Sequence, residues 1–301
     1  MTEVPAIAPT GTASAVRSEI RPRRVRFDWS DTPLHWIPGD PQTTHTINVL
    51  HLLLPAGEKW FVEVYRQALP LIDDPQLAAD VKGFMGQEAI HSRAHAAVLD
   101  HLLAQGLDPT PFTSRMEWLF AKLLGDEPLG RPMPRWLRRA WLKQRLAIIA
   151  AVEHFTAVLG MWVVDSPGLD ASGADPVMLD LLRWHGAEEV EHRDVAFDVF
   201  QHVSGSYARR VETMTVSAFM LAFLFARGTR FFLAADPTEP AKPTWRAFIR
   251  AGREGRLPTF RTMFGTVPSY LKPSHHPSQE GSAEPALAYL ASSPAAQAAA
   301  S

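Results

Sequence analysis

The feature that most constrains this chain is a repeated arrangement of glutamates and histidines. Each half of the pattern has a lone glutamate followed, about thirty to thirty-six positions later, by a Glu-x-x-His pair, and the second half has one extra histidine. The residues are Glu58, Glu88, His91, Glu153, His185, Glu189 and His192. Ferritin-like carboxylate bundles use such a pattern, on helices, to hold two metal ions. It predicts an all-α, ferritin-like bundle with additional C-terminal helices.

Helical geometry explains why these spacings suit a metal site. Residues three or four positions apart share one face of an α-helix, so Glu88 and His91 can point at the same ion. On a later helix, Glu189 and His192 fall within about 40° and 20° of His185 around the axis. The pattern therefore predicts one stripe of three ligands on that helix.

The same geometry separates neighbouring polar residues from the ligands. Glu188 and Glu191 lie further round the helix, which predicts contacts with ligands or with solvent rather than with metal. His95 lies one turn beyond His91 and is predicted to hydrogen-bond a ligand, with a role as an eighth ligand as the alternative. Glu63 is an alternative to Glu58, but it fits the pattern of a surface residue, and His154 is predicted to point away from the site.

Composition limits the chemistry. The sequence has no cysteine, so any metal must be held by nitrogen and oxygen ligands, which suits iron, with manganese and zinc as alternatives. Four glutamates would balance two divalent ions, whereas unbalanced charge is costly to bury. The formal net charge of -2 argues against a nucleic-acid partner.

The chain divides by composition into three parts. Residues 1–25 are predicted to form a disordered arm that ends in solvated arginines, residues 26–273 a helical metal-binding domain, and residues 274–301 a disordered tail rich in Ala, Ser and Pro. Helices are predicted over residues 74–105, 136–164, 176–203, 209–235 and 245–254. The first ligand helix is predicted to be interrupted near Pro55, because proline cannot donate a backbone hydrogen bond.

Nothing in the sequence predicts a transmembrane segment. The longest apolar stretch, Met214 to Phe225, is shorter than the roughly 20 residues that span a bilayer. A buried helix is the prediction there, and contact with a membrane surface is the alternative. The N-terminus has no apolar stretch typical of a signal peptide, so a cytoplasmic location is expected.

The stretches around the predicted ligands resemble a known family. Leu54–Phe61, Phe84–His95, Glu153–Thr156 and Trp184–Asp198 look like the bacterial family labelled predicted metal-dependent hydrolase. The resemblance covers about residues 25–278 and implies metal binding. The order of the seven ligands is also similar to that of the di-iron N-oxygenases that act on aryl amines.

The predicted ligands are compatible with two reactions. The first is O₂ activation by a di-iron oxidoreductase on an apolar or aromatic small molecule, with a possible electron donor as partner. The alternative is hydrolysis by a two-metal site, as the family label suggests. Metal storage without catalysis is a third reading. The all-α carboxylate pattern favours the oxidoreductase.

Overall fold

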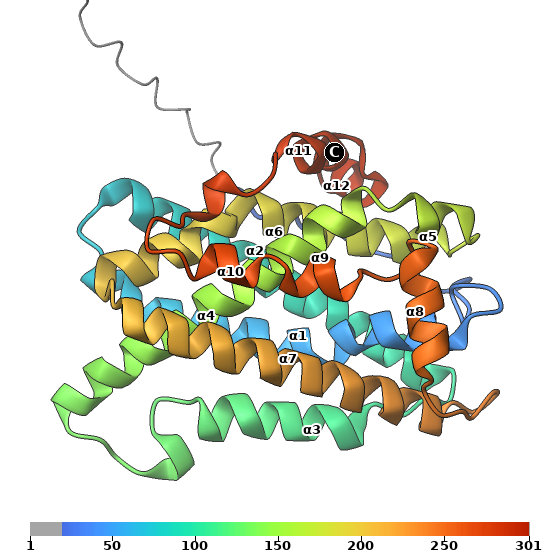
Figure 1. Cartoon of the computed structure of the whole chain (residues 1–301), viewed down its shortest axis with the longest axis horizontal. Coiled ribbons are helices and arrows are strands. Elements are labelled where there is room, and N and C mark those ends of the chain that lie inside the picture. The colour runs from blue at the N-terminus through green and yellow to red at the C-terminus, as the bar shows by residue number, and fades with distance from the viewer. Residues whose placement is uncertain (1–19, 301) are drawn as a thin grey trace, which may run out of the picture.

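The computed structural model describes residues 20–300, and within them the chain contains helices and no strands (Figure 1). The predicted all-α class is therefore confirmed, while a ferritin-like topology stays a prediction. The long helices are α1 (Pro41–Ala68), α2 (Pro75–Ala104), α4 (Arg135–Val164), α6 (Pro176–Val203) and α7 (Tyr207–Ala235). The shorter ones are α3 (Thr110–Trp118), α5 (Pro167–Ala171), α8 (Trp245–Arg253), α9 (Phe260–Phe264), α10 (Val267–Tyr270), α11 (Glu284–Ser292) and α12 (Pro294–Ala300).

Three of the long helices begin with the same local signal. Each has an aspartate followed by proline, and the carboxylates of Asp40, Asp74 and Asp175 accept hydrogen bonds from backbone N–H groups of the first turn. Proline suits the first helical position, where its missing N–H costs nothing, and the aspartate satisfies donors that have no partner within the helix. The starts of α2 and α6 are thus determined locally.

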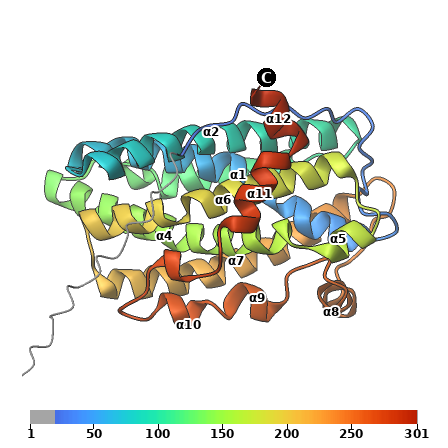
Figure 2. The same cartoon turned by 90° about the horizontal axis from the view of Figure 1, so that it is seen from above.

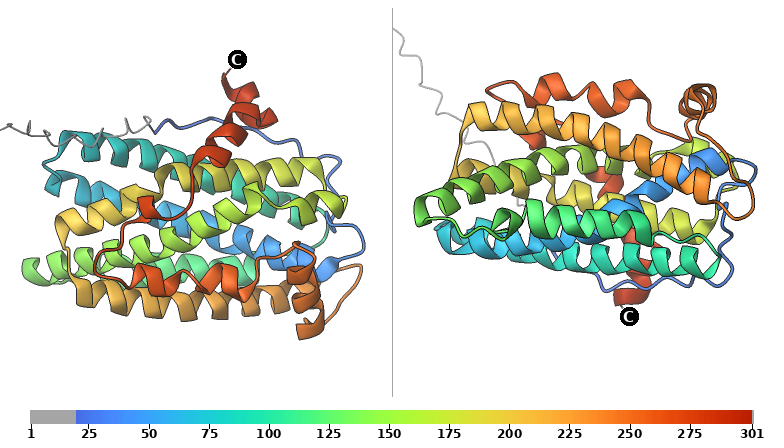
Figure 3. Two further views of the ribbon diagram at one scale, coloured as in Figure 1. Left: turned by 45° about the horizontal axis from the view of Figure 1, so that its top comes forward. Right: turned by 90° about the horizontal axis from the view of Figure 1, so that it is seen from below.

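Four helices form the bundle that carries the predicted ligands. α1 packs on α2 and α4 on α6, while α2–α6 and α1–α4 contacts close the arrangement. α7 lies along the outside against α1 and α4, and α3 lies against α1 (Figure 3). Two clusters of buried apolar side chains fill the interior, one around Trp184 and Leu52 and the other around Phe84 and Leu146. Glu58, Glu88, Glu153 and His192 each fall, along their helices, between residues of the two clusters.

A pair of glycines brings α4 and α6 into close contact beside the bundle's polar centre. A Cβ added to Gly160 would lie 2.2 Å from the carbonyl oxygen of Gly186, and one added to Gly186 would lie 2.8 Å from the Cα of Gly160. These are backbone atoms, which cannot move aside without shifting a helix. Gly186 directly follows His185, so the spacing of the two helices also positions that histidine.

We therefore expect Gly160→Ala to lower the free energy of unfolding by about 1–3 kcal/mol, the usual cost of overpacking. Chemical denaturation followed by circular dichroism measures this loss. Gly252→Ala on α8 is the matched control, because its added Cβ would meet nothing closer than 3.7 Å. Equal stability of the two variants would show that α4 and α6 can separate freely.

The predicted interruption of the first ligand helix is wrong. α1 continues through Pro55 without a break. Pro55 is buried, and its carbonyl oxygen accepts a hydrogen bond of 2.9 Å from the Ser92 hydroxyl on α2. Packing between α1 and α2 therefore offsets the backbone hydrogen bond that proline removes.

The C-terminal tail is ordered within the described residues, which corrects the prediction of disorder from residue 274. α11 packs on α6 and α4, and α12 also contacts α6. The buried carboxylate of Asp180 accepts hydrogen bonds from the Tyr289 hydroxyl, the Ser293 hydroxyl and the Ala295 N–H, at 2.7–2.9 Å. An aspartate on α6 thus fixes a segment whose composition alone suggests disorder.

The N-terminal arm is only partly described. Residues 1–19, for which disorder is predicted, lie outside the described residues. From Ile20 onward the chain runs along α2 before it enters α1 (Figure 2). Ile20 itself is buried, which corrects the expected disorder for the last part of the arm.

α7 differs from the predicted buried helix. Met214 is buried, but Phe219 and Phe223 are 75% and 57% exposed. Two helices of the described chain, α4 and α7, are long and apolar enough to cross a membrane by length and composition alone. In α4 most of the apolar stretch is buried inside the bundle, whereas in α7 only 22% is. The apolar face of α7 therefore contributes to the protein surface.

Candidate metal centre

The structure brings all seven predicted ligands together inside the bundle. α1 supplies one, α2 two, α4 one and α6 three, and each is at most 6% exposed. They fall into two groups, within each of which one potential ligand atom per residue lies within 4.8 Å of the others. The first group is Glu58, His91 and His185; the second is Glu88, Glu153, Glu189 and His192.

The contacts that the first group makes are longer than most hydrogen bonds. His185 Nε2 is 3.7 Å from Glu58 Oε1, and His91 Nδ1 is 3.5 Å from Oε1 of Glu189, which belongs to the second group. Ligands that surround one ion at about 2.0–2.2 Å lie roughly this far from one another. The shorter contact of 2.7 Å between His185 Nε2 and Glu189 Oε1 is a hydrogen bond.

The second group surrounds one imidazole nitrogen. His192 Nε2 lies 3.4 Å from Glu88 Oε1, 3.2 Å from Glu153 Oε2 and 3.3 Å from Glu189 Oε2. Glu189 therefore reaches both groups, with Oε1 toward His185 and Oε2 toward His192. A carboxylate in this position can bridge two ions.

The centre contains buried polar atoms without hydrogen-bond partners. Both carboxylate oxygens of Glu58, Glu88 and Glu153, and Nδ1 of His91, have none. More than nine in ten buried polar groups in proteins are paired, so a group of unpaired acceptors at one point requires an explanation. Cations would satisfy them, and the set of carboxylate oxygens and imidazole nitrogens suits divalent iron, manganese or zinc.

The pKa values of the buried side chains also indicate that the centre can bind cations. Burial raises the pKa of the Glu58 and Glu88 carboxyls well above their ordinary value, with nearby carboxylates adding to the rise for both. Burial and then the charge of Glu189 raise the pKa of Glu153 to about 7. Burial alone would lower the pKa of His192, but the carboxylates of Glu189 and Glu153 outweigh it and raise that pKa to about 10. In the metal-free protein, protons thus balance charge that cations can balance instead.

This proton uptake predicts a specific pH dependence. Burial alone would lower the pKa of His91, but its hydrogen bond to the Glu188 carboxylate and the nearby Glu189 carboxylate outweigh burial and raise that pKa to about 9, while the pKa of His192 is raised to about 10. The unfolded imidazoles release their protons near 6.5, so the folded metal-free protein binds more protons between pH 6.5 and 10. Its free energy of unfolding therefore falls as the pH rises through this window.

We expect the melting temperature of metal-free protein to decrease between pH 7 and 10, and bound Zn²⁺ to remove the decrease, since ligand imidazoles are deprotonated. Differential scanning calorimetry with and without metal measures both curves. A melting temperature that falls equally with pH in the presence and absence of Zn²⁺ would contradict the expectation.

Each histidine of the centre makes a hydrogen bond through the ring nitrogen that points away from the other predicted ligands. His91 Nε2 donates to Glu188 at 2.8 Å, His192 Nδ1 donates to the Gln87 side-chain oxygen at 3.0 Å, and His185 Nδ1 lies 2.6 Å from His95 Nε2. Such contacts fix the ring orientation and determine which nitrogen faces the metal. His95 and Glu188 thus contact His185 and His91, and their role beside metal ligands stays a prediction.

The chain of imidazoles continues beyond His95. His95 Nδ1 lies 2.7 Å from His51 Nδ1, and His51 Nε2 is buried without a partner. Burial and the neighbouring His185 lower the pKa of His51 to about 3, so its ring is neutral. The sequence offered no reason to place His51 here, because its spacing matches none of the ligands.

Glu191 and Arg23 correct two further expectations. The Glu191 side chain is only 3% exposed and accepts hydrogen bonds from Arg23 and Gln87. Arg23 also donates to Glu188 at 2.7 Å, so this arginine is part of a buried network and not a solvated arm. Arg23 lies more than 160 positions from Glu188 and Glu191 in the sequence. Helical spacing relates only nearby residues, so it did not predict these contacts.

Removing the Arg23 charge should therefore weaken the centre indirectly. Arg23→Gln leaves Glu188 without its cation, so the carboxylate that holds His91 loses its own anchor. We expect metal affinity to fall about 10-fold or more, the scale of losses for residues that orient ligands. Competition with a chromogenic chelator measures the affinity. The exposed Arg24→Gln is the control, and equal affinities in the two variants would contradict this role.

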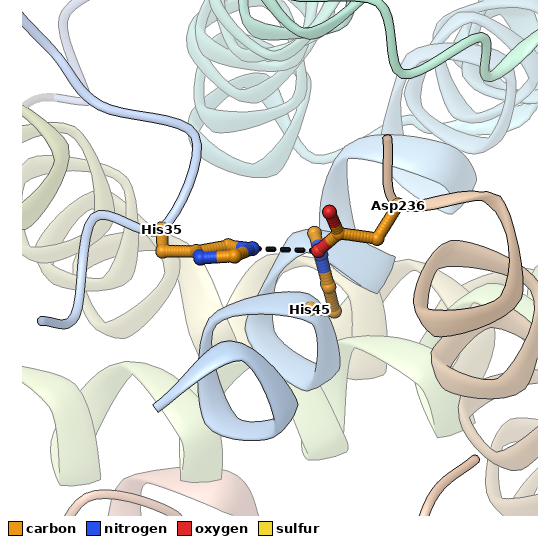
Figure 4. A group of neighbouring side chains, drawn as sticks. All are labelled: His35, His45 and Asp236. Atoms are coloured by element: carbon orange, nitrogen blue, oxygen red, sulfur yellow. Dashed lines mark hydrogen bonds and ion pairs between the residues drawn. The ribbon is translucent and has the colours of Figure 1, made fainter. Parts of the chain in front are cut away.

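The remaining polar residues lie elsewhere. Glu63 is exposed and pairs with Arg66, so it does not replace Glu58. His154 points away from Glu153 toward His275 and Glu280. A further group joins His35, His45 and Asp236, in which both imidazoles contact the same carboxylate (Figure 4).

A family model described as predicted metal-dependent hydrolase matches residues 21–281. No curated protein and no solved structure matches the chain. The preference for a di-iron oxidoreductase is therefore wrong. The family is described as a metal-dependent hydrolase, which supports the alternative, hydrolysis, instead.

Proposed function

The chain belongs to the predicted metal-dependent hydrolase family, and from this premise we propose that it is a hydrolase whose seven buried ligands hold two divalent metal ions. The observation that carries the proposal is the set of unpaired buried carboxylate oxygens converging in two groups. In the proposed centre, Glu58, His91 and His185 hold one ion. Glu88, Glu153 and His192 hold the other, with Glu189 between them.

Hydrolysis by two metal ions requires little from the protein besides the positioning of the metal ligands. Two bound divalent ions lower the pKa of water and withdraw charge from an ester, amide or phosphoryl oxygen. The chain contributes geometry, since the three histidines are oriented by Glu188, Gln87 and His95 before any ion arrives. Their facing nitrogens therefore need no reorganisation to bind metal.

Aromatic side chains line the centre and limit access of bulk water. The Phe84 ring lies 4.5 Å from the His192 ring, and the Trp184 ring lies 5.0 Å from the His91 ring. Both are fully buried. A site with apolar walls strengthens electrostatic interactions inside it and favours a small organic substrate over a highly charged polymer.

The proposal is tested by activity that depends on metal. Metal-free protein, and protein reconstituted with Zn²⁺, Mn²⁺ or Fe²⁺ without O₂, is assayed on a panel of chromogenic esters, amides and phosphate esters. We expect at least one substrate class to be cleaved only by reconstituted protein, with one oxygen atom from ¹⁸O-labelled water in the product. Absence of cleavage across the panel, together with O₂ consumption by the Fe²⁺ form, would overturn the proposal.

A further inference from the structure

A second group of potential ligands lies on the far side of α4 from the metal centre. His154 follows Glu153 in sequence but contacts the segment that passes over the bundle through α10 (Figure 1). There it meets His275 and Glu280, and one potential ligand atom from each of the three lies within 4.8 Å of the others. His154 and His275 are buried, and the Glu280 side chain is 15% exposed.

The spacing within this group is that of ligands around an ion. His154 Nδ1 lies 3.4 Å from Glu280 Oε2, and His275 Nδ1 lies 3.7 Å from Glu280 Oε1. Neither separation is a good hydrogen bond. Two imidazoles and one carboxylate at about 2.0–2.2 Å from a tetrahedral Zn²⁺ lie about 3.3–3.6 Å from one another.

Two independent observations point to a ligand here. His154 Nε2 lies 2.9 Å from the Thr266 hydroxyl. When it donates there, Nδ1 is left with its lone pair toward Glu280, as in ligand histidines with an outer hydrogen bond. In addition, His275 Nε2, Glu280 Oε1 and the Tyr270 hydroxyl are buried without hydrogen-bond partners.

The group that joins His35, His45 and Asp236 shows the opposite pattern (Figure 4). Both Nε2 atoms lie 2.6–2.7 Å from one oxygen, Asp236 Oδ2, which are hydrogen-bond distances. The other oxygen accepts from the N–H groups of Thr238 and Glu239. Every oxygen of that carboxylate is satisfied, so the group fixes the end of α7 and leaves no place for an ion.

We propose that His154, His275 and Glu280 form a separate site for one divalent ion of the zinc class, with water as its fourth ligand. The site ties α4 to the C-terminal segment, whose Glu280 carbonyl already accepts a hydrogen bond of 2.7 Å from Arg193 on α6. The positive charge of Arg210 lies nearby, over the Tyr270 ring. Glu280 supplies the negative charge that a cation needs beside it. The role is structural.

The test counts ions. Metal-free full-length protein is titrated with Zn²⁺, desalted and measured by mass spectrometry of the metal. We expect wild type to retain one ion more than His275→Ala or Glu280→Gln. His276→Ala should retain the wild-type number, because this neighbouring histidine bonds to Asp198 instead. Equal ion counts in wild type, His275→Ala and Glu280→Gln would overturn the proposal.

Hydrogen exchange provides a readout that is independent of the buried centre. Zn²⁺ should slow exchange in residues 266–281 of wild type and of His276→Ala, and should leave it unchanged in Glu280→Gln. Glu189→Gln, which alters only the buried centre, should keep this protection. Loss of ions in Glu189→Gln with protection intact separates the two sites. Equal protection in Glu280→Gln and wild type would again contradict the proposal.

Discussion

Glu189→Gln is expected to abolish at least one of the two proposed metal positions and to lower hydrolysis by more than about 100-fold, the upper range for residues that only orient ligands. Glu189 faces both groups, with Oε1 at 2.7 Å from His185 and Oε2 at 3.3 Å from His192. An amide keeps the shape but loses the charge and one acceptor oxygen. Metal content and turnover on the best substrate of the panel measure the effect.

Two neighbours on the same helix provide matched controls. Glu191 faces Arg23 and Gln87 rather than the centre, so Glu191→Gln should bind both ions. Glu188 accepts a hydrogen bond from His91 Nε2, the ring nitrogen that points away from the centre. The metal content of Glu188→Gln should therefore fall between those of the other two variants. Equal losses in Glu191→Gln and Glu189→Gln would show that the bridging position is wrongly assigned.

His192→Ala is expected to remove about half of the bound metal and most activity while the protein stays folded. His192 Nε2 is surrounded by three of the carboxylates, and no other histidine belongs to its group. The fold itself rests on the two apolar clusters, in which the substitution removes the contact between the His192 ring and Phe84 and leaves the other contacts in place. Metal analysis combined with far-ultraviolet circular dichroism measures both outcomes.

The comparison variant for His192 is His202→Ala near the end of the same helix. His202 is partly exposed and pairs with Asp73, far along α6 from the centre. This variant should keep full metal content and activity. Unchanged metal content in His192→Ala would defeat the assignment of the second group.

Local rules made much of the centre predictable. The three-residue spacing of Glu88 and His91 places both on one face of α2 whatever surrounds it, and the stripe on α6 follows from the same period. Asp-Pro pairs likewise determine where α2 and α6 begin. Such features depend only on residues within a few positions, so sequence alone specifies them.

The parts that were missed depend on contacts between distant segments. Arg23 meets Glu188 across 165 positions, and Gln87 meets His192 across 105. The order of the C-terminal tail likewise depends on Asp180, more than 100 positions earlier. No spacing rule links residues so far apart. The exposed apolar face of α7 was missed because hydrophobicity predicts burial without specifying which elements are available to cover it.

The most direct test of the account is anomalous diffraction from crystals of metal-loaded protein, recorded on either side of the absorption edge of the bound metal. We expect two peaks inside the bundle about 3.5–4 Å apart, one beside Glu58, His91 and His185 and the other beside Glu88, Glu153 and His192. Glu189 should lie between the peaks. A bundle interior without anomalous peaks, with the seven side chains bonded only to one another, would contradict the two-metal centre.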